Sequence, residues 1–469
     1  MAYIIIEDFR AGLDRRKLAV ASPQGSLQTC ENAHITRGGE IEKRLAMVAK
    51  YSLSPGQTFG FAGANGVLYT FGSVASPAVP SGITYQRLVH PSSHAMDGVV
   101  FAEFYDGKVF VAAHYTNGDT LHFYDGARIT DWDSASGATV AGQAAVAGIT
   151  LKDKFYAAYL SVLGFSAIGD PTLWQTGTGY GFKNMANQSA GSEALTALGR
   201  YGSLMAVFAR RNTQIWYLDP DPTLNVQQQV LPNIGTFAAR SVVSFGERDV
   251  FFLSDTGARS LRTQQSGLQA GVSDVGTPID DDLLAYMATL TEAQRLAAAA
   301  EIDPINGRYV LAIGNRAYVF SYFASSKISA WSTYEFGFQV TDWVSMDGRL
   351  WGRAGDTIYQ LGGDDGATYD STVVEVDLPY IDGRAIATFK NFTAIDIVSQ
   401  GEWDVYINTD PNQPTEESKI AVINNITLSG PSLGMLGHSP VCKLRFVSRG
   451  TGPAKLSKII VHYDAAEAT

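Results

Sequence analysis

The sequence predicts an all-β protein built around a β-propeller of about seven blades. Short apolar runs bounded by Gly, Asp and Asn turns recur along most of the chain, as at Leu204 to Phe208 and at Ile215 to Leu218, and such runs are typical of antiparallel hairpins. Only 17% of the residues are charged, 11% are aromatic and 47 are glycine, which favours an ordered, turn-rich β protein over a disordered chain. The turns also recur at a nearly regular spacing.

This spacing is typical of propeller blades. The turns between two apolar runs are centred at residues 65, 106, 153, 201, 247, 306 and 347. Successive centres lie about 41 to 59 residues apart, and a repeat of roughly 40 to 50 residues with several strands is what a blade produces. We therefore expect the propeller to cover residues 51–365. Trp132 and Trp331 each end one repeat and are expected to pack between blades.

The amino-terminal residues 1–50 lack the alternation and are expected to form an extended arm. The basic pairs Arg15–Arg16 and Lys43–Arg44 are compatible with contact to a neighbouring surface or with a solvated face. The isoleucines at 4–6 are followed by Glu7 and Asp8, a pattern too short and too acidic for a signal peptide.

The longest interval between turns contains a helical insertion at residues 277–300. Thr277 is placed to cap the first helix, and Asp280 to Asp282 lie in its first turn, where carboxylates complement the helix dipole. Thr291 opens a capping box for a second short helix that runs through Ala300. The insertion explains why this interval is longer than the others.

After Gly366 the regular spacing ends and a separate domain is expected over residues 366–469. Its strand candidates are residues 371–379, 387–399, 403–408, 418–427, 441–448 and 456–463. Because these strands are longer and follow no 45-residue repeat, they favour a small β-sandwich-like domain.

Metal-binding patterns are weak, so we predict no metal and no cofactor. His90 and His94 are separated by a proline, without the glutamate of an HExxH motif. His114 and His122 flank an expected hairpin and are interpreted as a cross-strand surface pair. Residues 219–221 and 364–366 lack the alternating ligand spacing of a calcium loop, and Asp280 to Asp282 are explained by the start of the helix.

Catalytic patterns are also weak, and no catalytic residue is predicted. The chain has no GxSxG elbow. Gly177 to Gly181 lacks a lysine and a following helix, and Ser254 to Gly257 fails the spacing of the repeated box of propeller glycosidases. Cys30 and Cys442 have no helix start or basic neighbourhood that would lower a thiol pKa. We expect both to be reduced thiols in the core.

The net charge of the chain indicates how it would interact with nucleic acid. The formal net charge is -11, and an acidic surface disfavours tight binding of a phosphate backbone. Such a surface suits nucleic acid that slides past without sticking. No apolar run approaches the roughly 18 residues needed to cross a bilayer, so we expect no membrane insertion and synthesis in a cytoplasm.

The amino-terminal motif resembles the signature of bacteriophage tail nozzle (tail tubular protein B-like) proteins, F-x-G-G-L-N-x-R, P-x-G, L-x-N and G-x-L-x-K-R-P-G. The matching segments are Phe9 to Arg16, Pro23 to Gly25, Leu27 to Ala33 and Gly38 to Arg44. Two positions depart from it, since Ala11 replaces a glycine and Leu45–Ala46 replaces Pro-Gly. Four later segments are similar to the middle region of the family: Asn212 to Pro220, Gly235 to Ala239, Phe252 to Gly257 and Trp331 to Tyr334.

The resemblance implies a structural virion protein of a short-tailed phage, and not an enzyme. It implies a propeller-based homo-oligomeric ring, usually of six copies, in the virion tail after synthesis in the host cytoplasm. The ring would be attached to an adaptor protein and would contact tail fibre or spike proteins. Double-stranded DNA would leave through its channel without sequence-specific binding.

Two other classes of function remain open from the sequence. A propeller module that binds a host-surface glycan or protein would show an exposed aromatic cluster on one face. A carbohydrate-active enzyme would show a deep pocket with paired carboxylates of perturbed pKa.

Overall fold

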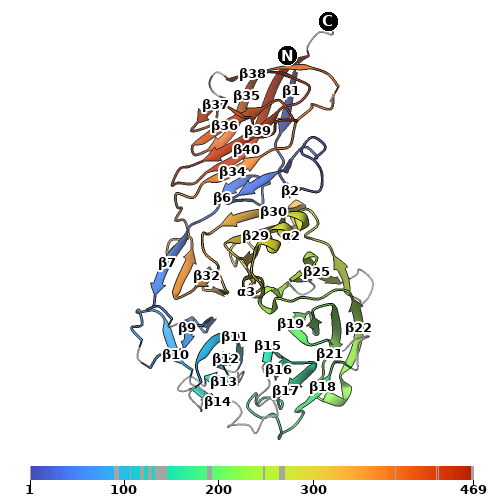
Figure 1. The fold of residues 1–469 in the computed structure, drawn as a ribbon, viewed down its shortest axis with the longest axis vertical. Helices are drawn as coiled ribbons and strands as arrows, with labels where there is room; N and C mark the ends of the chain where they lie inside the picture. Colours follow the sequence, from blue (N-terminus) through green and yellow to red (C-terminus); the bar gives the residue numbers. More distant parts are fainter. Residues whose placement is uncertain are drawn as a thin grey trace.

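In the computed structural model, a ring of antiparallel sheets carries an elongated β domain on one side (Figure 1). The structure describes residues 2–465 except 57, 76, 89–93, 106, 117–120, 125–128, 132–144, 187–192, 247–248, 264–269, 386, 429 and 431. The all-β prediction and the propeller class are confirmed. Trp132 falls outside the described residues.

Five separate sheets within the described residues have the four-stranded form of a blade. The first two sheets consist of β11 (Met96–Tyr105), β12 (Lys108–Tyr115), β13 (Leu121–Tyr124) and β14 (Ile129–Asp131), and of β15 (Ala145–Leu151), β16 (Lys154–Tyr159), β17 (Val162–Phe165) and β18 (Gly181–Asn184). The next two consist of β19 (Leu195–Tyr201), β20 (Leu204–Ala209), β21 (Asn212–Tyr217) and β22 (Val226–Pro232), and of β23 (Val243–Phe245), β24 (Asp249–Ser254), β25 (Gly257–Thr263) and β26 (Ala270–Ser273). The fifth consists of β31 (Asp342–Met346), β32 (Arg349–Ala354), β33 (Thr357–Leu361) and β7 (Met47–Ser52).

The predicted count of seven blades is therefore wrong, because two repeats do not form separate four-stranded sheets. One is three-stranded, and in it β10 (Thr84–Arg87) pairs in parallel with β9 (Val67–Gly72), which follows β8 (Gly60–Ala64). The other continues into a larger sheet and comprises β27 (Ala299–Ile302), β28 (Tyr309–Ile313), β29 (Arg316–Phe323) and β30 (Ile328–Glu335). These two units fill the ring beside the five blades, since β8 contacts β11 and β31, and β27 contacts β23 and β31.

The predicted turns stand at the first hairpin of their units. Asn65 and Gly66 join β8 to β9, and Asp347 and Gly348 join β31 to β32, all with positive φ. Glycine adopts this conformation freely, and Asn and Asp adopt it more readily than most residues. The turns at 153, 201 and 306 have the same place in their own units, whereas those at 106 and 247 fall on residues that are not described.

The amino-terminal residues do not form a free arm, because their strands are built into three sheets. β7 pairs antiparallel with β33, from Met47 opposite Leu361 to Ser52 opposite Thr357. A strand from the start of the chain thus completes the last blade and closes the ring by hydrogen bonds. Of the remaining amino-terminal strands, β1 and β6 pair with β40, and β4 pairs with β34. We name the domain that the amino-terminal and carboxyl-terminal strands form together the terminal domain.

The terminal domain consists of two sheets. One contains β1 (Ala2–Ile6), β5 (Ala33–Ile35), β6 (Ile41–Lys43), β35 (Lys390–Gln400), β38 (Leu433–Ser439) and β40 (Lys455–Ala465). The other contains β2 (Gly12–Leu13), β3 (Ser26–Leu27), β4 (Thr29–Glu31), β34 (Val374–Asp377), β36 (Trp403–Asn408), β37 (Ser418–Ile423) and β39 (Lys443–Ser448). Six of these strands overlap the strand candidates predicted after Gly366, whereas β38 was not predicted.

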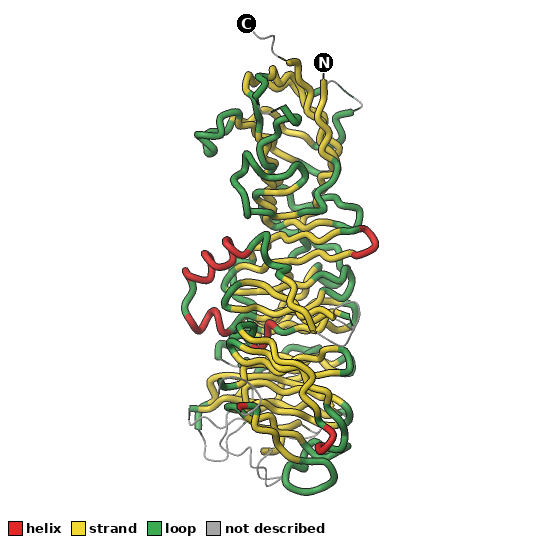
Figure 2. Tube along the Cα trace, turned by 90° about the vertical axis from the view of Figure 1, so that its right-hand side faces the viewer, coloured by secondary structure: helices red, strands yellow, loops and turns green. Residues whose placement is uncertain are grey.

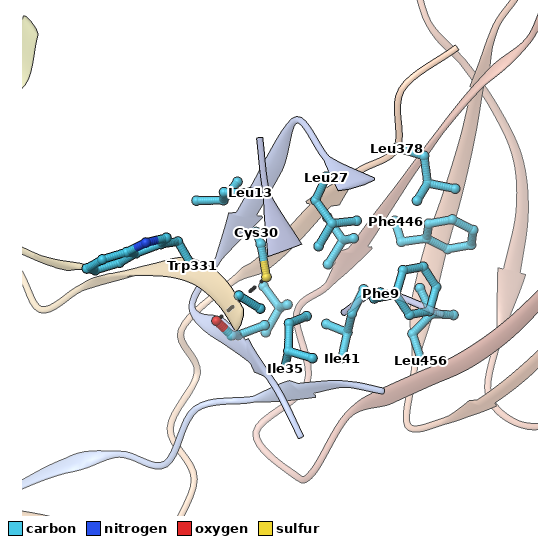
Figure 3. Packing of buried hydrophobic residues seen from close by; sticks show 14 of the residues in the cluster. Phe9, Leu13, Leu27, Cys30, Ile35, Ile41, Trp331, Leu378, Phe446 and Leu456 are labelled. Atoms are coloured by element: carbon cyan, nitrogen blue, oxygen red, sulfur yellow. Dashed lines mark hydrogen bonds between the residues drawn. The ribbon is translucent and has the colours of Figure 1, made fainter. Parts of the chain in front are cut away.

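The propeller and the terminal domain share one sheet of 11 described strands, because β30 pairs in parallel with β4, with Thr333 opposite Glu31. One hydrophobic cluster continues across this junction (Figure 3). There Trp331 of the propeller lies beside Leu13 and Cys30, while Phe9 approaches Phe446 of the carboxyl-terminal strands. The two parts are thus joined by backbone pairing as well as by packing.

The helical insertion is present but its boundaries differ from the prediction. Helix α2 (Asp280–Thr289) has Ile279 at its N-cap, whereas Thr277 donates to the Asp274 carbonyl instead of capping. The capping box of Thr291 is confirmed in α3 (Glu292–Leu296). That helix ends four residues before Ala300, because Ala299 and Ala300 pair with β28 as part of β27. Figure 2 shows both helices projecting from one side of the stacked strands.

Candidate functional site

Arg240 extends across the centre of the propeller. It is carried by the 3-10 turn η3 (Ala239–Ser241), which two buried hydroxyl groups fix in place. The Thr236 hydroxyl donates to the Leu253 carbonyl at 2.6 Å, and the Ser241 hydroxyl donates to the Ala238 carbonyl at 2.7 Å. The turn therefore has a defined position from which Arg240 extends.

Arg240 contacts units on the other side of the ring. Its Nε donates to the Val100 carbonyl at 3.2 Å, its Nη1 donates to the Thr341 carbonyl at 3.0 Å, and its Nη2 donates to the Val99 carbonyl. Its Nη1 also lies 3.0 Å from Oδ1 of Asp342. One side chain thus ties η3 to β11 and to β31.

Asp342 joins Arg240 to a second arginine. Arg353 donates from Nε to the Asp342 carboxylate at 2.6 Å and from Nη1 to the Thr58 carbonyl at 3.0 Å. Burial alone would raise the pKa of Asp342, but the guanidinium groups of Arg240 and Arg353 hold it below its ordinary value. The carboxylate is therefore ionised and locks the last blade to its neighbours.

Two cavities lie along the axis and share Val100, Val146, Ala239 and Arg240 in their walls. The first, of about 410 Å³, is lined by Glu103, Glu301 and other residues of the innermost strands. The second, of about 470 Å³, is mainly apolar and reaches Leu296 of α3. Arg240 belongs to both walls and therefore lies between the two cavities.

The first cavity brings together two carboxyl groups that no sequence motif marks. Glu103 accepts from the backbone N–H of Thr150 and from Nη2 of Arg200, both at 2.9 Å. Burial raises the pKa of Glu103, and these two donors oppose that rise. Burial also raises the pKa of Glu301, whose Oε1 accepts from the N–H of Ile302 at 2.8 Å.

These groups can bind a polar ligand or take up a proton. Glu301 is the better proton donor, because no cation lies within ion-pair distance of it among the described residues. The sequence gives a weak indication of Arg240 and of Glu301. Arg240 is the lone charge in Gly235 to Val243, and Glu301 directly follows an alanine run. Neither signal indicates that the residues meet.

Of the histidines named from the sequence, His114 and His122 do not face each other. Strand register places His122 opposite Val111 and His114 opposite Gly98, so the expected cross-strand pair is wrong. His114 instead contacts Asp97 at 2.6 Å. His90 lies outside the described residues. Within the described part of the chain, no group of three or more His, Cys, Asp or Glu side chains could hold a metal ion.

The acidic runs have structural partners in the described residues. Asp280 pairs with Arg259 at 2.8 Å, and Asp364 pairs with Lys50 at 2.7 Å. Asp221 accepts from the N–H of its own loop residue Thr223 at 2.9 Å. These carboxylates hold local turns and neighbouring strands together.

The cysteines are core residues, as predicted, whereas Trp331, which was expected to pack between blades, lies in the cluster that also contains residues of the terminal domain. Cys30 and Cys442 are free, fully buried thiols, and burial raises the pKa of each to about 12. Trp331 is 1% exposed and donates from its indole nitrogen to the Val275 carbonyl at 2.7 Å.

Comparisons with known proteins do not identify a family. No protein-family profile and no curated protein matches the chain. Among solved structures, a luciferin-regenerating enzyme is similar over 57% of this chain and 91% of its own, with 11% identity and a TM-score of 0.36. A likeness at that level carries no argument about function. Among the described helices, none is long and apolar enough to cross a membrane.

Proposed function

We propose that the chain is a structural subunit of the tail nozzle of a short-tailed bacteriophage. In this role, copies form a homo-oligomeric ring, with six as the expected number, attached to the adaptor protein. The ring surrounds the channel through which double-stranded DNA leaves, and it contacts tail fibre or spike proteins. The chain would reside in the virion tail.

The observation that carries this proposal is where the residues of the nozzle-like signature lie. Phe9, Leu13 and Leu27 are buried at the junction between propeller and terminal domain (Figure 3). Gly12 has a φ of +59°, and a Cβ there would lie 2.7 Å from the Trp331 carbonyl oxygen. The resembling residues are therefore those that join a propeller to a terminal β domain.

Two further signature residues support the same junction through polar contacts. Asn32 donates to the Val373 carbonyl at 2.9 Å, and its Oδ1 accepts from Nε of Arg44 at 3.1 Å and from the N–H of Glu335 at 2.9 Å. Asn32 has a φ of 55°, which asparagine tolerates better than most residues. Signature residues with these contacts indicate a structural role rather than a catalytic one, as expected for a structural protein.

The contacts at the centre of the propeller favour a channel between copies rather than through one propeller. Arg240 extends from η3 to the units of β11 and β31, and the two cavities beside it hold only about 410 and 470 Å³, which is too little for a duplex. The excess of acidic over basic residues is larger in residues 51–365 than in the rest of the chain. A ring whose propellers face the lumen would therefore present a wall that repels phosphate.

The direct test is to locate the chain in phage particles. Gold-labelled antibody fragments raised against the terminal domain should label the distal part of the tail in electron micrographs, next to the adaptor. Labelling of the capsid or of fibre tips, or absence of the chain from purified particles, would contradict the proposal. A fragment raised against an unrelated protein provides the control.

One observation favours a second candidate, a carbohydrate-active enzyme. Glu103 and Glu301 line the same cavity, and burial raises the pKa of both, as general acids require. Glu103 is already held by Thr150 and Arg200, so Glu301 is the candidate acid. Hydrolysis of a panel of bacterial surface glycans that Glu301→Gln abolishes would establish this alternative.

A further inference from the structure

A further cavity, of about 260 Å³, lies at the junction of the propeller and the terminal domain. The hairpin of β5 and β6 contributes His34, Glu42 and Lys43, and the turn from β27 to β28 contributes Asp303 and Arg308. We name this space the junction cavity. Its volume is below the roughly 300 Å³ at which sites for drug-sized ligands begin, so it fits a small ligand.

Arg308 is the unusual group in its wall. The residue is 5% exposed, and its Nε is buried without a hydrogen-bond acceptor among the described residues. Its nearest anion is Asp303, with Nη1 3.8 Å from Oδ2, which is too long for a hydrogen bond. The Asp303 oxygens instead accept from Ile305 N–H at 3.1 Å and from Asn306 Nδ2 at 2.9 Å. A buried guanidinium nitrogen without an acceptor is costly, and an oxyanion could supply an acceptor to this guanidinium.

Lys43 adds a second positive charge. It is 1% exposed, and its ammonium group donates to the carbonyls of Asp370 and Gly450 at 2.7 and 2.6 Å. The nearby Asp370 carboxylate pairs instead with Arg44 at 3.1 Å. Among the described residues no ion pair of Lys43 is seen, and the Asp370 carboxylate stabilises its charge only from a longer distance.

The negative groups of the cavity are already paired. Glu42 lies 3.0 Å from Lys455, and the nearby His34 and Lys455 lower its pKa to about 2. Burial lowers the pKa of His34 to about 4, so the imidazole is neutral at pH 7, and its Nδ1 lies 2.7 Å from the Tyr334 hydroxyl. Glu42 is thus paired with Lys455, and the Asp303 oxygens are bonded to Ile305 and Asn306, which leaves Arg308 and Lys43 without a directly bonded carboxylate among the described residues.

We propose that the junction cavity binds a small oxyanion, a carboxylate or inorganic phosphate, on the guanidinium of Arg308. The planar guanidinium can donate two parallel hydrogen bonds to either anion, and Lys43 balances the charge that enters. Because Arg308 belongs to the propeller and Lys43 to the terminal domain, the bound anion stabilises the junction between them. This site is independent of the propeller axis and of the nozzle role.

The test is titration of the full chain with sodium acetate and with sodium phosphate at pH 7, at constant ionic strength set with sodium chloride. We expect saturable heat in calorimetry and a saturable rise in melting temperature for at least one anion. Binding of acetate alone assigns a carboxylate site, and binding of phosphate alone assigns a phosphate site. No saturable response to either anion overturns the proposal.

Two variants and one control make the assignment specific. Arg308→Lys keeps the charge and loses the paired donors, so the affinity should fall at least tenfold while the circular dichroism spectrum is unchanged. Arg308→Met should abolish binding. Arg211→Met, at an exposed arginine outside the cavity, should bind as the wild type does. Wild-type affinity in Arg308→Lys and Arg308→Met would overturn the assignment to Arg308.

Discussion

Replacing Arg240 with methionine tests the contacts that this side chain makes across the centre of the propeller. Methionine keeps much of the aliphatic length but removes the donors to Val99, Val100 and Thr341 and the ion pair with Asp342. Removing one partner of a buried ion pair costs about 3 to 5 kcal/mol. Because the Arg240 side chain is 23% exposed and Asp342 keeps Arg353, we expect the lower end, about 3 kcal/mol.

The assay is denaturant unfolding followed by tryptophan fluorescence. Arg211→Met removes an exposed arginine of the same ring and should change the free energy of unfolding by less than about 0.5 kcal/mol. A double-mutant cycle of Arg240→Met with Asp342→Asn should give a coupling energy of about 1 to 3 kcal/mol. A cost of Arg240→Met no larger than that of the control, or strict additivity in the cycle, would refute the role of Arg240.

The pH dependence provides a second check on the same contact. The pKa of Asp342 is lowered from 3.8, so the folded state binds that proton less readily than the unfolded chain does. Its stabilisation is therefore present above pH 3.8 and is lost as the pH falls below that value. The stability difference between wild type and Arg240→Met should be constant from about pH 7 to pH 5 and should shrink below about pH 4. A difference that grows on acidification would contradict this reasoning.

Three further results are expected. Because burial raises the pKa of Glu301 from 4.5, ionisation of this carboxyl group opposes folding at neutral pH. Glu301→Gln should therefore increase the free energy of unfolding at pH 8, by an amount on the order of 1 kcal/mol, and should have no effect below about pH 4. Destabilisation at pH 8 would indicate that the ionised carboxylate is needed. Gly12→Ala should cost more than about 1 kcal/mol, since its φ is +59° and the new Cβ would lie 2.7 Å from the Trp331 carbonyl oxygen; a melting temperature equal to that of the wild type would contradict this close approach. Cys30 and Cys442, with pKa values of about 12, should not react with iodoacetamide at pH 8 in the native protein and should both react in guanidinium chloride; rapid native labelling at either thiol would contradict its burial.

Features set by local chemistry could be predicted from the sequence. Asn65–Gly66 and Asp347–Gly348 provide positive φ wherever they occur, so the hairpins between β8 and β9 and between β31 and β32 could be placed. The capping box of Thr291 depends on residues three positions apart, and it too was correct.

Features set by distant contacts could not be predicted. Ala299 and Ala300 have high helix propensity, yet pairing with β28 makes them a strand. The amino-terminal strands appear as an arm because their partners lie in β33, β34 and β40, several hundred residues away. The blade count was wrong because the β27–β30 repeat continues through β4 into another domain, which spacing cannot reveal.

The candidate site was missed for the same reason. Arg240 meets Val100 and Thr341 across separations of 140 and 101 residues, and no motif connects these positions. Arg308 and Lys43 are likewise brought to one cavity only by the junction of two domains.

Electron cryomicroscopy of the assembled tail is the most direct test of the proposed nozzle role. The proposal predicts a ring of copies around one central channel, acidic side chains on its wall, and Arg240 extending across the centre of each propeller. Nucleic-acid density along a propeller axis, a channel wall lined by lysine and arginine, or a tail without this chain would contradict it.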